Sequence, residues 1–394
     1  MSTQRLHSFK PNKRIAIVHD WFDQFAGAEK VIQELLTCYP EADLYALTDF
    51  MNEETRQVCL DRPVKTSFIQ RLPFARSSFR SYFFLFPLAI EQFDLRKYDI
   101  IISSSHSVAK GILTSAEQLH VCYCHSPARY TWDMYHLYTQ QLTQNPFKRL
   151  LSRFVLHYMR LWDFQAAQRV DHFIANSRFV QKRIQKNYRR KSQVIHPPVA
   201  CHTYNVEPDI KDYYVTVSRL VGYKKIDLIV ETFKQTKKPL VVIGTGAEYK
   251  KLKALARQSP NIKVLGRLSD EETIEYVSHA RAFVFASEED FGIAPVEAQS
   301  AGVPVIAYGK GGAVESILDG ETGILFPEQT VDSLRQAVDQ FEKTESTFDR
   351  YFIKQHAEKY NASRFRYEIT ELIAEKIRDF EEPAPILSRE HVAK

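Results

Sequence analysis

Several features that mark common protein classes are missing from this sequence of 394 residues. Its five cysteines are an odd number without a C-x-x-C pair, so we expect free thiols rather than a disulfide framework or a zinc site. No G-x-G-x-x-G follows the first predicted strand at 14–20, which argues against a dinucleotide oxidoreductase. The acidic pair Asp20 and Asp23 lacks a supporting ligand set, so no metal ion is expected.

Long apolar runs are missing as well. The start, MSTQRLHSFKPNKR, is polar and has no apolar stretch followed by a cleavage site, so we expect a cytoplasmic protein without a secretion signal. The nearest approach to a membrane span, Tyr82 to Ile90, is about half of the ~20 residues that crossing a bilayer requires. This segment can lie on a membrane but cannot cross one.

Length and charge suggest two different halves. A chain of 394 residues exceeds the usual size of one domain, and 44% hydrophobic with 26% charged residues is ordinary for a globular protein. Residues 1–200 contain 27 Lys and Arg against 17 Asp and Glu, whereas the remainder contains 26 against 31. The basic first half suits a polyanionic partner, such as a phosphate or an anionic lipid.

Short apolar runs alternate with helical stretches along most of the chain, which predicts an α/β protein with parallel strands. The pattern pauses between His196 and Asp212 and then restarts, so we expect two doubly wound domains, at 1–200 and 201–360. A helix at Ala362 to Phe380, within a terminal segment 361–394, is expected to cross back to the first domain. Ligands of such sheets bind at the carboxyl ends of the strands. Two unrelated domains in tandem remain the alternative.

The most specific segment is SEEDFGIAPVEAQSAGVPVIAYGKGGAVESI, at 287–317. Glu289 follows a buried strand, and Phe291 and Gly292 turn the chain into a helix that carries Glu297. A helix N-terminus offers free N–H groups to phosphate or sugar oxygens, and Gly292 permits close backbone approach. The carboxylate of Glu297 can accept hydrogen bonds from two ribose hydroxyls. The spacing alone also fits a solvated helix face.

Cations and glycines precede this segment. In VSRLVGYKKIDLIVETF a strand ends at Arg219 and a helix begins near Lys224, and two such cations would neutralise a diphosphate and the charge that grows as it departs. Gly244 and Gly246 form a strand-to-helix turn in GTGAEY, which is a weak signal by itself. Arg267 follows a further strand, IKVLG.

The first half holds two more candidates. In AGAEK, Gly27 lies at a helix N-terminus, where its N–H can reach a phosphate. In CYCHSPARYTWDMYH, His125 lies at the carboxyl end of a strand. A single histidine in a sequence is more often a packed or surface residue than a catalyst.

Together these motifs resemble the retaining glycosyltransferases of family 4. E-x-F-G-x-x-x-x-E, A-G-V-P-V-I and G-G-x-x-E carry the resemblance in the second half, and C-H-S-P-x-R-Y-x-W-D is similar to mannosyltransferases of bacterial polysaccharide assembly. The resemblance implies two facing Rossmann-like domains of the GT-B type, with the active site in the interdomain cleft. It also implies front-face displacement, in which the departing phosphate takes the acceptor proton, and no cofactor or metal ion.

The resemblance assigns a role to each candidate. Glu289 would contact the donor sugar, Glu297 the ribose, and His125 the donor sugar or the acceptor hydroxyl. Arg219 and Lys224 would bind the diphosphate and act in catalysis. The remaining donor-binding positions are Gly27, Gly244, Gly246, Arg267, Phe291 and Gly292. The sequence departs from the family at Lys225, where many relatives carry glycine.

An acceptor surface is predicted at residues 64–90, which contain four cations, seven aromatic residues and no acid. Cations interleaved with aromatic rings suit an anionic bilayer surface, so a peripheral position on the membrane is expected. A core helix with a solvated basic edge fits the pattern as well. No recognised module supports nucleic-acid binding.

The sequence therefore predicts a metal-independent hexosyltransferase, with mannose from GDP-mannose as the first choice of donor and a lipid-linked or polysaccharide acceptor. A UDP-sugar-dependent transferase of the same fold is the alternative. A degenerate membrane-surface scaffold should have lost Arg219, Lys224, Glu289 or Glu297, and all four are present. A phosphorylase should show a lysine suited to pyridoxal phosphate, and nothing marks one out.

Overall fold

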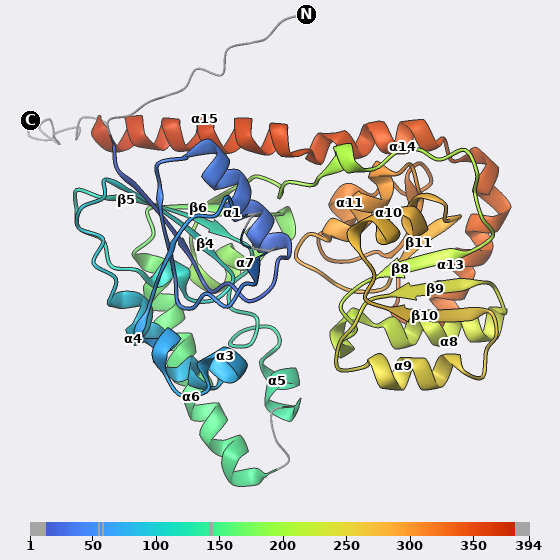
Figure 1. The fold of residues 1–394 in the computed structure, drawn as a ribbon, viewed down its shortest axis with the longest axis horizontal. Coiled ribbons are helices and arrows are strands. Elements are labelled where there is room, and N and C mark those ends of the chain that lie inside the picture. The colour runs from blue at the N-terminus through green and yellow to red at the C-terminus, as the bar shows by residue number, and fades with distance from the viewer. Residues whose placement is uncertain (1–12, 54–55, 57–58, 142–144, 383–394) are drawn as a thin grey trace, which may run out of the picture. The chain divides into compact units, whose positions relative to one another are not determined.

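The chain forms two compact units (Figure 1). The computed structural model describes residues 13–382 apart from 54–55, 57–58 and 142–144, so the predicted tail at 383–394 lies outside the described residues. The two units differ from the predicted domains, which meet at residue 200, in two ways. A short segment before residue 200 belongs to the second unit, and most of the last helix belongs to the first. Unit 1 contains residues 1–174, 183–193 and 366–394, and unit 2 contains 175–182 and 194–365.

Unit 1 is built on a seven-stranded sheet with the order β3-β2-β1-β4-β5-β6-β7. Strand β1 pairs in parallel with β2 on one side and β4 on the other, so that Ile17 lies between Leu44 and Ile102. The central strands are buried along their whole length, as strands covered on both faces must be. The strand bounds are β1 Ile15–His19, β2 Asp43–Ala46, β3 Val64–Thr66, β4 Ile100–Ser105, β5 Leu119–Cys124, β6 His172–Ala175 and β7 Ser192–Val194.

The helices of unit 1 differ widely in length. Short helical turns fill residues 68–91, and a single long helix, α6, precedes β6. Their bounds are α1 Gly27–Cys38, η1 Phe68–Arg71, α3 Ala75–Ser78, η2 Phe79–Leu85, α4 Phe86–Glu91, η3 Ala109–Gly111, α5 Tyr135–Gln141, α6 Pro146–Gln168 and α7 Arg178–Tyr188. The first residues of α7 belong to unit 2.

Unit 2 has a six-stranded sheet with the order β10-β9-β8-β11-β12-β13, and its strand pairs are parallel. The predicted strands are confirmed here as they are in unit 1. The strand bounds are β8 Tyr214–Val217, β9 Leu240–Ile243, β10 Ile262–Gly266, β11 Ala282–Phe285, β12 Val305–Tyr308 and β13 Gly323–Phe326.

Helices alternate with these strands, so apolar clusters cover both faces of the sheet. One cluster joins α8 and α13 through side chains such as Phe233 and Phe341, and the other joins the sheet to α11. The bounds are η4 Cys201–Thr203, η5 Gly222–Lys224, α8 Ile226–Thr236, α9 Tyr249–Ala256, α10 Asp270–Ser278, α11 Ile293–Ser300, α12 Ala313–Ser316, α13 Val331–Thr344, η6 Glu345–Thr347, α14 Arg350–Ala357, η7 Glu358–Tyr360 and α15 Ala362–Glu381.

Both sheets have the doubly wound strand order, which confirms the predicted α/β class. In this order the connections reverse direction between β1 and β4 in unit 1, and between β8 and β11 in unit 2. Loops that follow neighbouring parallel strands meet at the carboxyl edge of the sheet, and ligands of such folds bind at this switch point. The loops after β8 and β11 are those that carry Arg219, Lys224 and Glu289.

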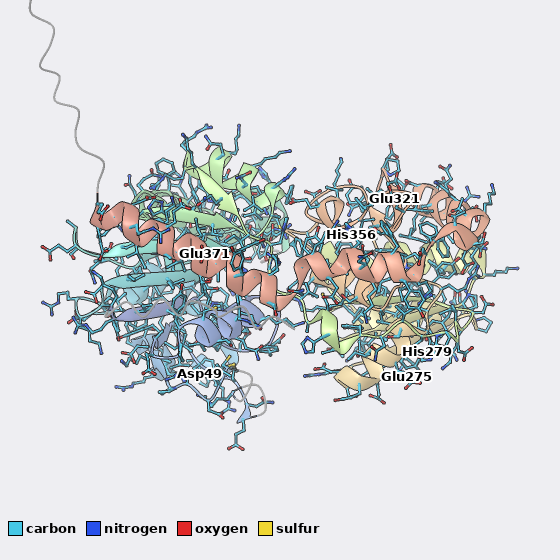
Figure 2. The ribbon with its side chains drawn as sticks, turned by 90° about the horizontal axis from the view of Figure 1, so that it is seen from above. Asp49, Glu275, His279, Glu321, His356 and Glu371 are labelled. Atoms are coloured by element: carbon cyan, nitrogen blue, oxygen red, sulfur yellow. The ribbon has the colours of Figure 1, made fainter. Side chains whose placement is uncertain are left out.

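The predicted terminal helix is α15, which begins in unit 2 and from Arg366 onwards belongs to unit 1. Arg366 Nη1 lies 2.5 Å from Glu34 Oε2 of α1, and Lys13 Nζ lies 2.6 Å from Glu381 Oε1. Glu371 lies on its exposed side (Figure 2). Among the described residues, no helix combines the length and the apolar character that crossing a membrane requires. The five cysteines are free, as predicted.

Candidate active site

An ion pair joins the two loops at the switch point of unit 2. Lys224, the last residue of η5, binds the carboxylate of Glu289, and the same carboxylate oxygen accepts a hydrogen bond of 3.0 Å from Ser287 Oγ. Arg219 Nη2 donates to Tyr223 Oη at 2.8 Å in the first of these loops. Lys224 and Glu289, 65 positions apart in the sequence, are thus brought into contact.

The glycines after β9 fix the backbone that carries Arg219. A Cβ atom at Gly244 would lie 1.9 Å from Ser218 O, and one at Gly246 would lie 2.3 Å from Leu220 O. The two segments are also joined by hydrogen bonds, including Leu220 N to Thr245 O at 2.8 Å. Glycine is therefore needed at both positions for packing against residues 218–220, which include Arg219.

The sequence departs from the family pattern at Lys225, and the backbone there shows what the position requires. Its backbone has φ +56° and ψ +33°, in the left-handed region, and it is the N-cap of α8. Glycine enters this region without steric cost, whereas a side chain does not. The glycine of many relatives is therefore favoured by the turn itself, and Lys225 occupies the same turn at some conformational cost.

Helix α11 begins directly after Gly292, whose φ of +89° turns the chain out of β11. Glu297 is the fifth residue of the helix and is half-buried. The ring of Phe291, predicted to bind donor, is instead buried against His196 and Tyr360, with ring centroids 5.3 and 5.5 Å apart. Only the backbone of Phe291 can therefore face a ligand.

The G-G-x-x-E turn after β12 packs closely against the backbone of the 287–292 loop. A Cβ atom at Gly311 would lie 2.6 Å from Glu289 O, and one at Gly312 would lie 2.3 Å from Asp290 O. Gly312 N donates to Glu289 O at 2.7 Å. The two glycines are therefore required because the backbone that carries Glu289 approaches so closely.

Glu315, the acid of this turn, was not among the predicted site residues. Its carboxylate accepts hydrogen bonds from the N–H groups of Arg178 and Phe179 at 2.9 and 3.0 Å, and lies 3.0 Å from His196 Nε2. Burial alone would raise the pKa of Glu315, but the hydrogen bonds from His196 and from the two N–H groups lower it. Its charge therefore caps the N-terminus of α7.

Residues near the C-terminal end of unit 2 stabilise the G-G-x-x-E turn by hydrogen bonds. His356 of α14, seen in Figure 2, donates from Nε2 to Ser316 O at 3.1 Å, and Tyr360 Oη donates to Glu315 O at 2.7 Å. Arg267 lies on the far side of the switch point, exposed at the end of β10. Unit 2 thus brings Arg219, Lys224 and Glu289 onto adjoining loops, while Arg267 is carried by an outer strand.

In unit 1, α1 begins at Gly27, as predicted, with Ala26 as an extended N-cap. The carboxylate of Glu29 accepts a hydrogen bond of 2.9 Å from Ala26 N and lies 3.5 Å from His19 Nε2. An acid in the first turn stabilises a helix start. It also places negative charge beside the N–H groups that were expected to face a phosphate.

His125 follows β5 and has a constrained ring. Its Nε2 lies 2.8 Å from Ser104 Oγ, and its N–H donates to Ser105 O at 2.9 Å. Burial, together with the neighbouring His106 and His19, lowers the pKa of His125 well below its usual value. The ring is therefore neutral near pH 7, which suits hydrogen bonding to a sugar hydroxyl rather than binding of an anion.

Asp20 organises the loop after β4 and was not predicted to have this role. Its two carboxylate oxygens accept four backbone hydrogen bonds, of 2.6 to 3.0 Å, from residues 106–109. Burial alone would raise the pKa of Asp20, but His106, His19 and these N–H groups lower it. Across the part of the chain that the structure describes, no three His, Cys, Asp or Glu side chains group so as to hold a metal ion.

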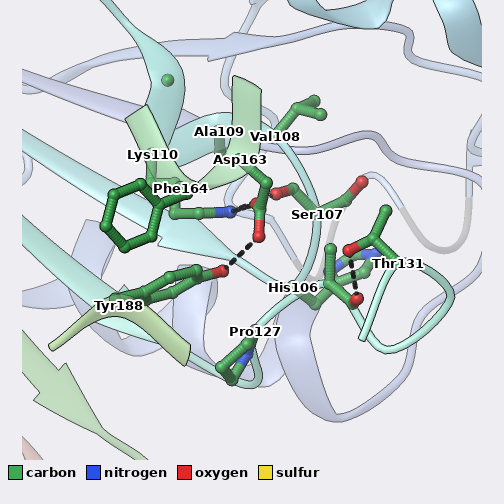
Figure 3. A network of polar contacts seen from close by, with 12 residues as sticks. His106, Ser107, Val108, Ala109, Lys110, Pro127, Thr131, Asp163, Phe164 and Tyr188 are labelled. Atoms are coloured by element: carbon green, nitrogen blue, oxygen red, sulfur yellow. Dashed lines mark hydrogen bonds and ion pairs between the residues drawn. The ribbon is translucent and has the colours of Figure 1, made fainter. Parts of the chain in front are cut away.

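A buried ion pair joins Lys110 of η3 to Asp163 of α6 (Figure 3). Lys110 Nζ lies 2.5 Å from Asp163 Oδ1 of α6 and 2.5 Å from Ser107 O, and both side chains are almost fully buried. Asp163 Oδ2 accepts hydrogen bonds from Trp132 Nε1 at 2.7 Å and Tyr188 Oη at 2.8 Å. Burial alone would lower the pKa of Lys110, but Asp163 raises it, so Lys110 keeps its charge.

Other residues of the C-H-S-P-x-R-Y-x-W-D motif also form hydrogen bonds and an ion pair. Tyr130 Oη lies 2.6 Å from Ser107 Oγ, and Asp133 forms an ion pair with Arg183. Arg183 in addition donates to Ser126 Oγ at 3.0 Å. Much of this motif therefore fixes the loop that follows His125.

Two family models match the chain in succession. Glycosyltransferase Family 4 matches residues 25–202, and Glycosyl transferases group 1 matches residues 204–361. Together they include the loops of both sheets described above. The chain belongs to the family 4 glycosyltransferases.

Curated relatives align over part of the chain. An uncharacterized glycosyltransferase of Methanocaldococcus jannaschii is 26% identical over 171 residues, which are 43% of this chain and 48% of the relative. A GDP-mannose-dependent monoacylated alpha-(1-6)-phosphatidylinositol monomannoside mannosyltransferase of Corynebacterium glutamicum is 34% identical over 133 residues, which are 30% of this chain and 35% of the relative. The chain thus spans a third to a half of the length of these relatives.

Solved structures align over nearly the whole chain. Anabaena HepE in complex with UDP-glucose gives a TM-score of 0.68 at 17% identity, covering 92% of this chain and 99% of that one. The sucrose-phosphate synthase of Thermosynechococcus elongatus gives 0.70 at 14% identity, covering 93% and 99%. This likeness shows the fold, which is of the GT-B type.

Breaking the buried pair from one side should destabilise unit 1. Lys110→Met or Asp163→Asn should each lower the free energy of unfolding by about 3–5 kcal/mol, because the remaining partner is left without its hydrogen-bonded counterpart. The double variant Lys110→Met with Asp163→Leu should cost less than the sum of the two single changes. Urea unfolding followed by tryptophan fluorescence measures this, with the exposed Asp94→Asn as control. Strictly additive costs would contradict a coupled pair.

Replacing Glu315 should give a pH-dependent loss of stability. Glu315→Gln should cost about 1–3 kcal/mol at pH 7, because hydrogen bonds to a charged acceptor are lost. Since folding lowers the pKa of Glu315, its contribution is complete above the ordinary value of 4.5 and disappears as the pH falls through the folded value. Thermal unfolding should therefore separate wild type from variant at pH 7 and less so below pH 4.5. An equal difference at both pH values, or an equal effect of the exposed Glu328→Gln, would count against this role.

Proposed function

We propose that this protein is a retaining glycosyltransferase that moves a hexose from a nucleoside diphosphate to an acceptor hydroxyl. The observation that carries the proposal is the grouping of Arg219, Lys224 and Glu289 on adjoining loops at the switch point of unit 2. Two cations at this place can balance a diphosphate, and they stabilise it most as it departs with growing negative charge. Glu297 accepts hydrogen bonds from the ribose of the same donor.

The ion pair between Lys224 and Glu289 gives each residue a position before the donor binds. The carboxylate holds the ammonium group at the switch point, and Ser287 holds the carboxylate. On binding, the diphosphate provides a second anion for Lys224, and the carboxylate of Glu289 turns to the sugar hydroxyls. The donor phosphates lie at the N-terminus of α11, where Gly292 allows close approach.

The transfer replaces one bond to the anomeric carbon by another on the same face of the sugar. The bond to the diphosphate oxygen breaks, the acceptor oxygen bonds to the carbon, and the acceptor proton passes to the departing phosphate. No carboxylate nucleophile takes part in this scheme. His125 holds a sugar or acceptor hydroxyl by a hydrogen bond from its neutral ring. Because Arg219 and Lys224 meet the diphosphate charge, the reaction requires no divalent metal ion or cofactor.

GDP-mannose is the donor that we propose first. The name of the Corynebacterium glutamicum relative states a GDP-mannose-dependent mannosyltransferase, and the two cations of the diphosphate site suit any nucleoside diphosphate sugar. A UDP-sugar is the second candidate, since the fold neighbour from Anabaena was solved with UDP-glucose.

The proposed acceptor is a lipid-linked glycan or a growing polysaccharide, reached from the cytoplasmic face of a membrane. Within the predicted surface at 64–90, Arg71 and Arg76 are exposed, but Phe79 and Phe86 are buried in the core of unit 1. Arg80 forms an ion pair with Asp23, with 2.5 Å between Nη2 and Oδ2. This segment can therefore present cations and a few rings to a membrane, but fewer rings than its sequence suggests.

A panel of nucleotides tests the donor site. GDP, UDP, ADP and their sugar conjugates should be compared by thermal shift in the presence of EDTA, and one nucleotide should stabilise the protein selectively. Glu297→Ala should weaken this binding about tenfold to a hundredfold, because hydrogen bonds to a charged group are lost. Glu275→Ala, an exposed glutamate of α10, is the matched control and should bind as wild type does.

No shift from any nucleotide would overturn the proposal and favour a scaffold without catalysis. A shift that appears only with divalent metal would contradict the metal-independent mechanism. A selective shift that Glu297→Ala leaves intact would place the nucleotide elsewhere.

A further inference from the structure

Helix α6 exposes a row of large apolar side chains to solvent. Phe147 is 76% exposed and Phe154 is 66% exposed, although residues of this type are normally at least half-buried. The full row is Phe147, Leu150, Leu151, Phe154, Tyr158 and Leu161. In Figure 1 the first turns of α6 extend away from the sheet of unit 1.

The row occupies one face of the helix. At 100° per residue its six members fall within an arc of about 100°, and they extend over about 21 Å of the helix axis. A different face is buried, through Leu156, Met159 and Asp163. The exposed row is therefore a second apolar face and not the edge of the packed one.

The charge around this face has a single sign. Residues 145–162 contain no acid, and the first acid of α6 is the buried Asp163. At 100° per residue, Lys148 and Arg153 border the row on its two sides, whereas Arg149 and Arg160 lie on the opposite side of the helix. An apolar face bordered by cations matches the interface of an anionic bilayer, where rings and aliphatic chains enter below the headgroups and cations meet lipid phosphates. A symmetric pair of these helices would instead bring cations against cations.

A second exposed ring belongs to the same part of unit 1. Phe74 is 82% exposed and has a left-handed backbone with φ +56°, which is costly for a large side chain. The turns around it and α6 share one apolar cluster, in which Val155 and Trp162 of α6 pack with Phe79 and Phe86. The exposed cations Arg71 and Arg76 flank Phe74.

We propose that the exposed face of α6 docks unit 1 on an anionic lipid bilayer. The helix lies in the plane of the interface, with the row from Phe147 to Leu161 buried among the acyl chains and Lys148 and Arg153 at the phosphates. The proposal deepens the lipid-linked acceptor suggested above, but it depends only on the surface of unit 1. Its test therefore stands even if the donor or the acceptor is different.

Vesicle binding tests the proposal. The full-length protein should co-sediment with vesicles of phosphatidylglycerol and phosphatidylcholine, and less with phosphatidylcholine alone. Phe147→Ser with Phe154→Ser should weaken binding about tenfold or more, because two rings no longer enter the bilayer. The matched control is Tyr351→Ser with Tyr367→Ser, which removes two rings that are 75% and 62% exposed elsewhere, and it should bind as wild type does. Far-ultraviolet circular dichroism and the thermal midpoint show that both variants fold.

The remaining outcomes each overturn the proposal. They are failure of the wild type to bind anionic vesicles, equal loss in the control variant, and unchanged binding after the α6 changes. A wild-type dimer that the α6 variant converts to a monomer, measured by light scattering, would show that a second copy covers this face instead.

Discussion

The loop from Ser287 to Gly292 has to be held still, because it carries the glutamate and the helix start on which the proposed donor site depends. Close backbone approach holds it on one side, where Gly311 and Gly312 leave no room for a Cβ atom. The ion pair with Lys224 holds it on the other. Tyr360 and His356 in turn anchor the supporting turn, so the geometry of one short loop depends on residues from four parts of unit 2.

Unit 1 uses buried charge for a similar purpose. Asp20 fixes the loop after β4 through four N–H groups, and the Lys110–Asp163 pair connects that loop to α6. Trp132 then links the pair to the motif that follows His125. A buried charge is costly to desolvate unless it is fully paired, and both carboxylates here are surrounded by donors. The loops near His125 are therefore fixed by polar contacts that a purely apolar core would not supply.

The fold was accessible from the sequence because it depends on local patterns, and so was the position of Arg219, Lys224 and Glu289 in the loops after their strands. Buried parallel strands give continuous apolar runs, and glycine marks turns such as the one before α11. The contacts of Asp20, Lys110, Asp163 and Glu315 join segments far apart in the chain, so spacing could not show them. The exposed face of α6 escaped for another reason: apolar residues lie on two of its faces, and the sequence does not tell which one is packed.

Two expectations changed for physical reasons. The ring of Phe291 packs against His196 and Tyr360, so only the backbone of this residue can face a donor. The aromatic residues at 64–90 are divided between core and surface, since short helical turns bury every few residues. In both cases the sequence gives the type of the side chain but not the direction in which it points.

The central claim is that Lys224 binds the diphosphate of the donor, whereas Glu297 binds its ribose. Calorimetric titration of wild type, Lys224→Ala and Glu297→Ala with the diphosphate and the monophosphate of the nucleoside that binds best separates these roles. Lys225→Gly, which suits the left-handed turn, is the control. We expect Lys224→Ala to lose most of the preference for diphosphate over monophosphate, and Glu297→Ala to weaken both ligands by the same factor. An unchanged preference in Lys224→Ala would contradict the account.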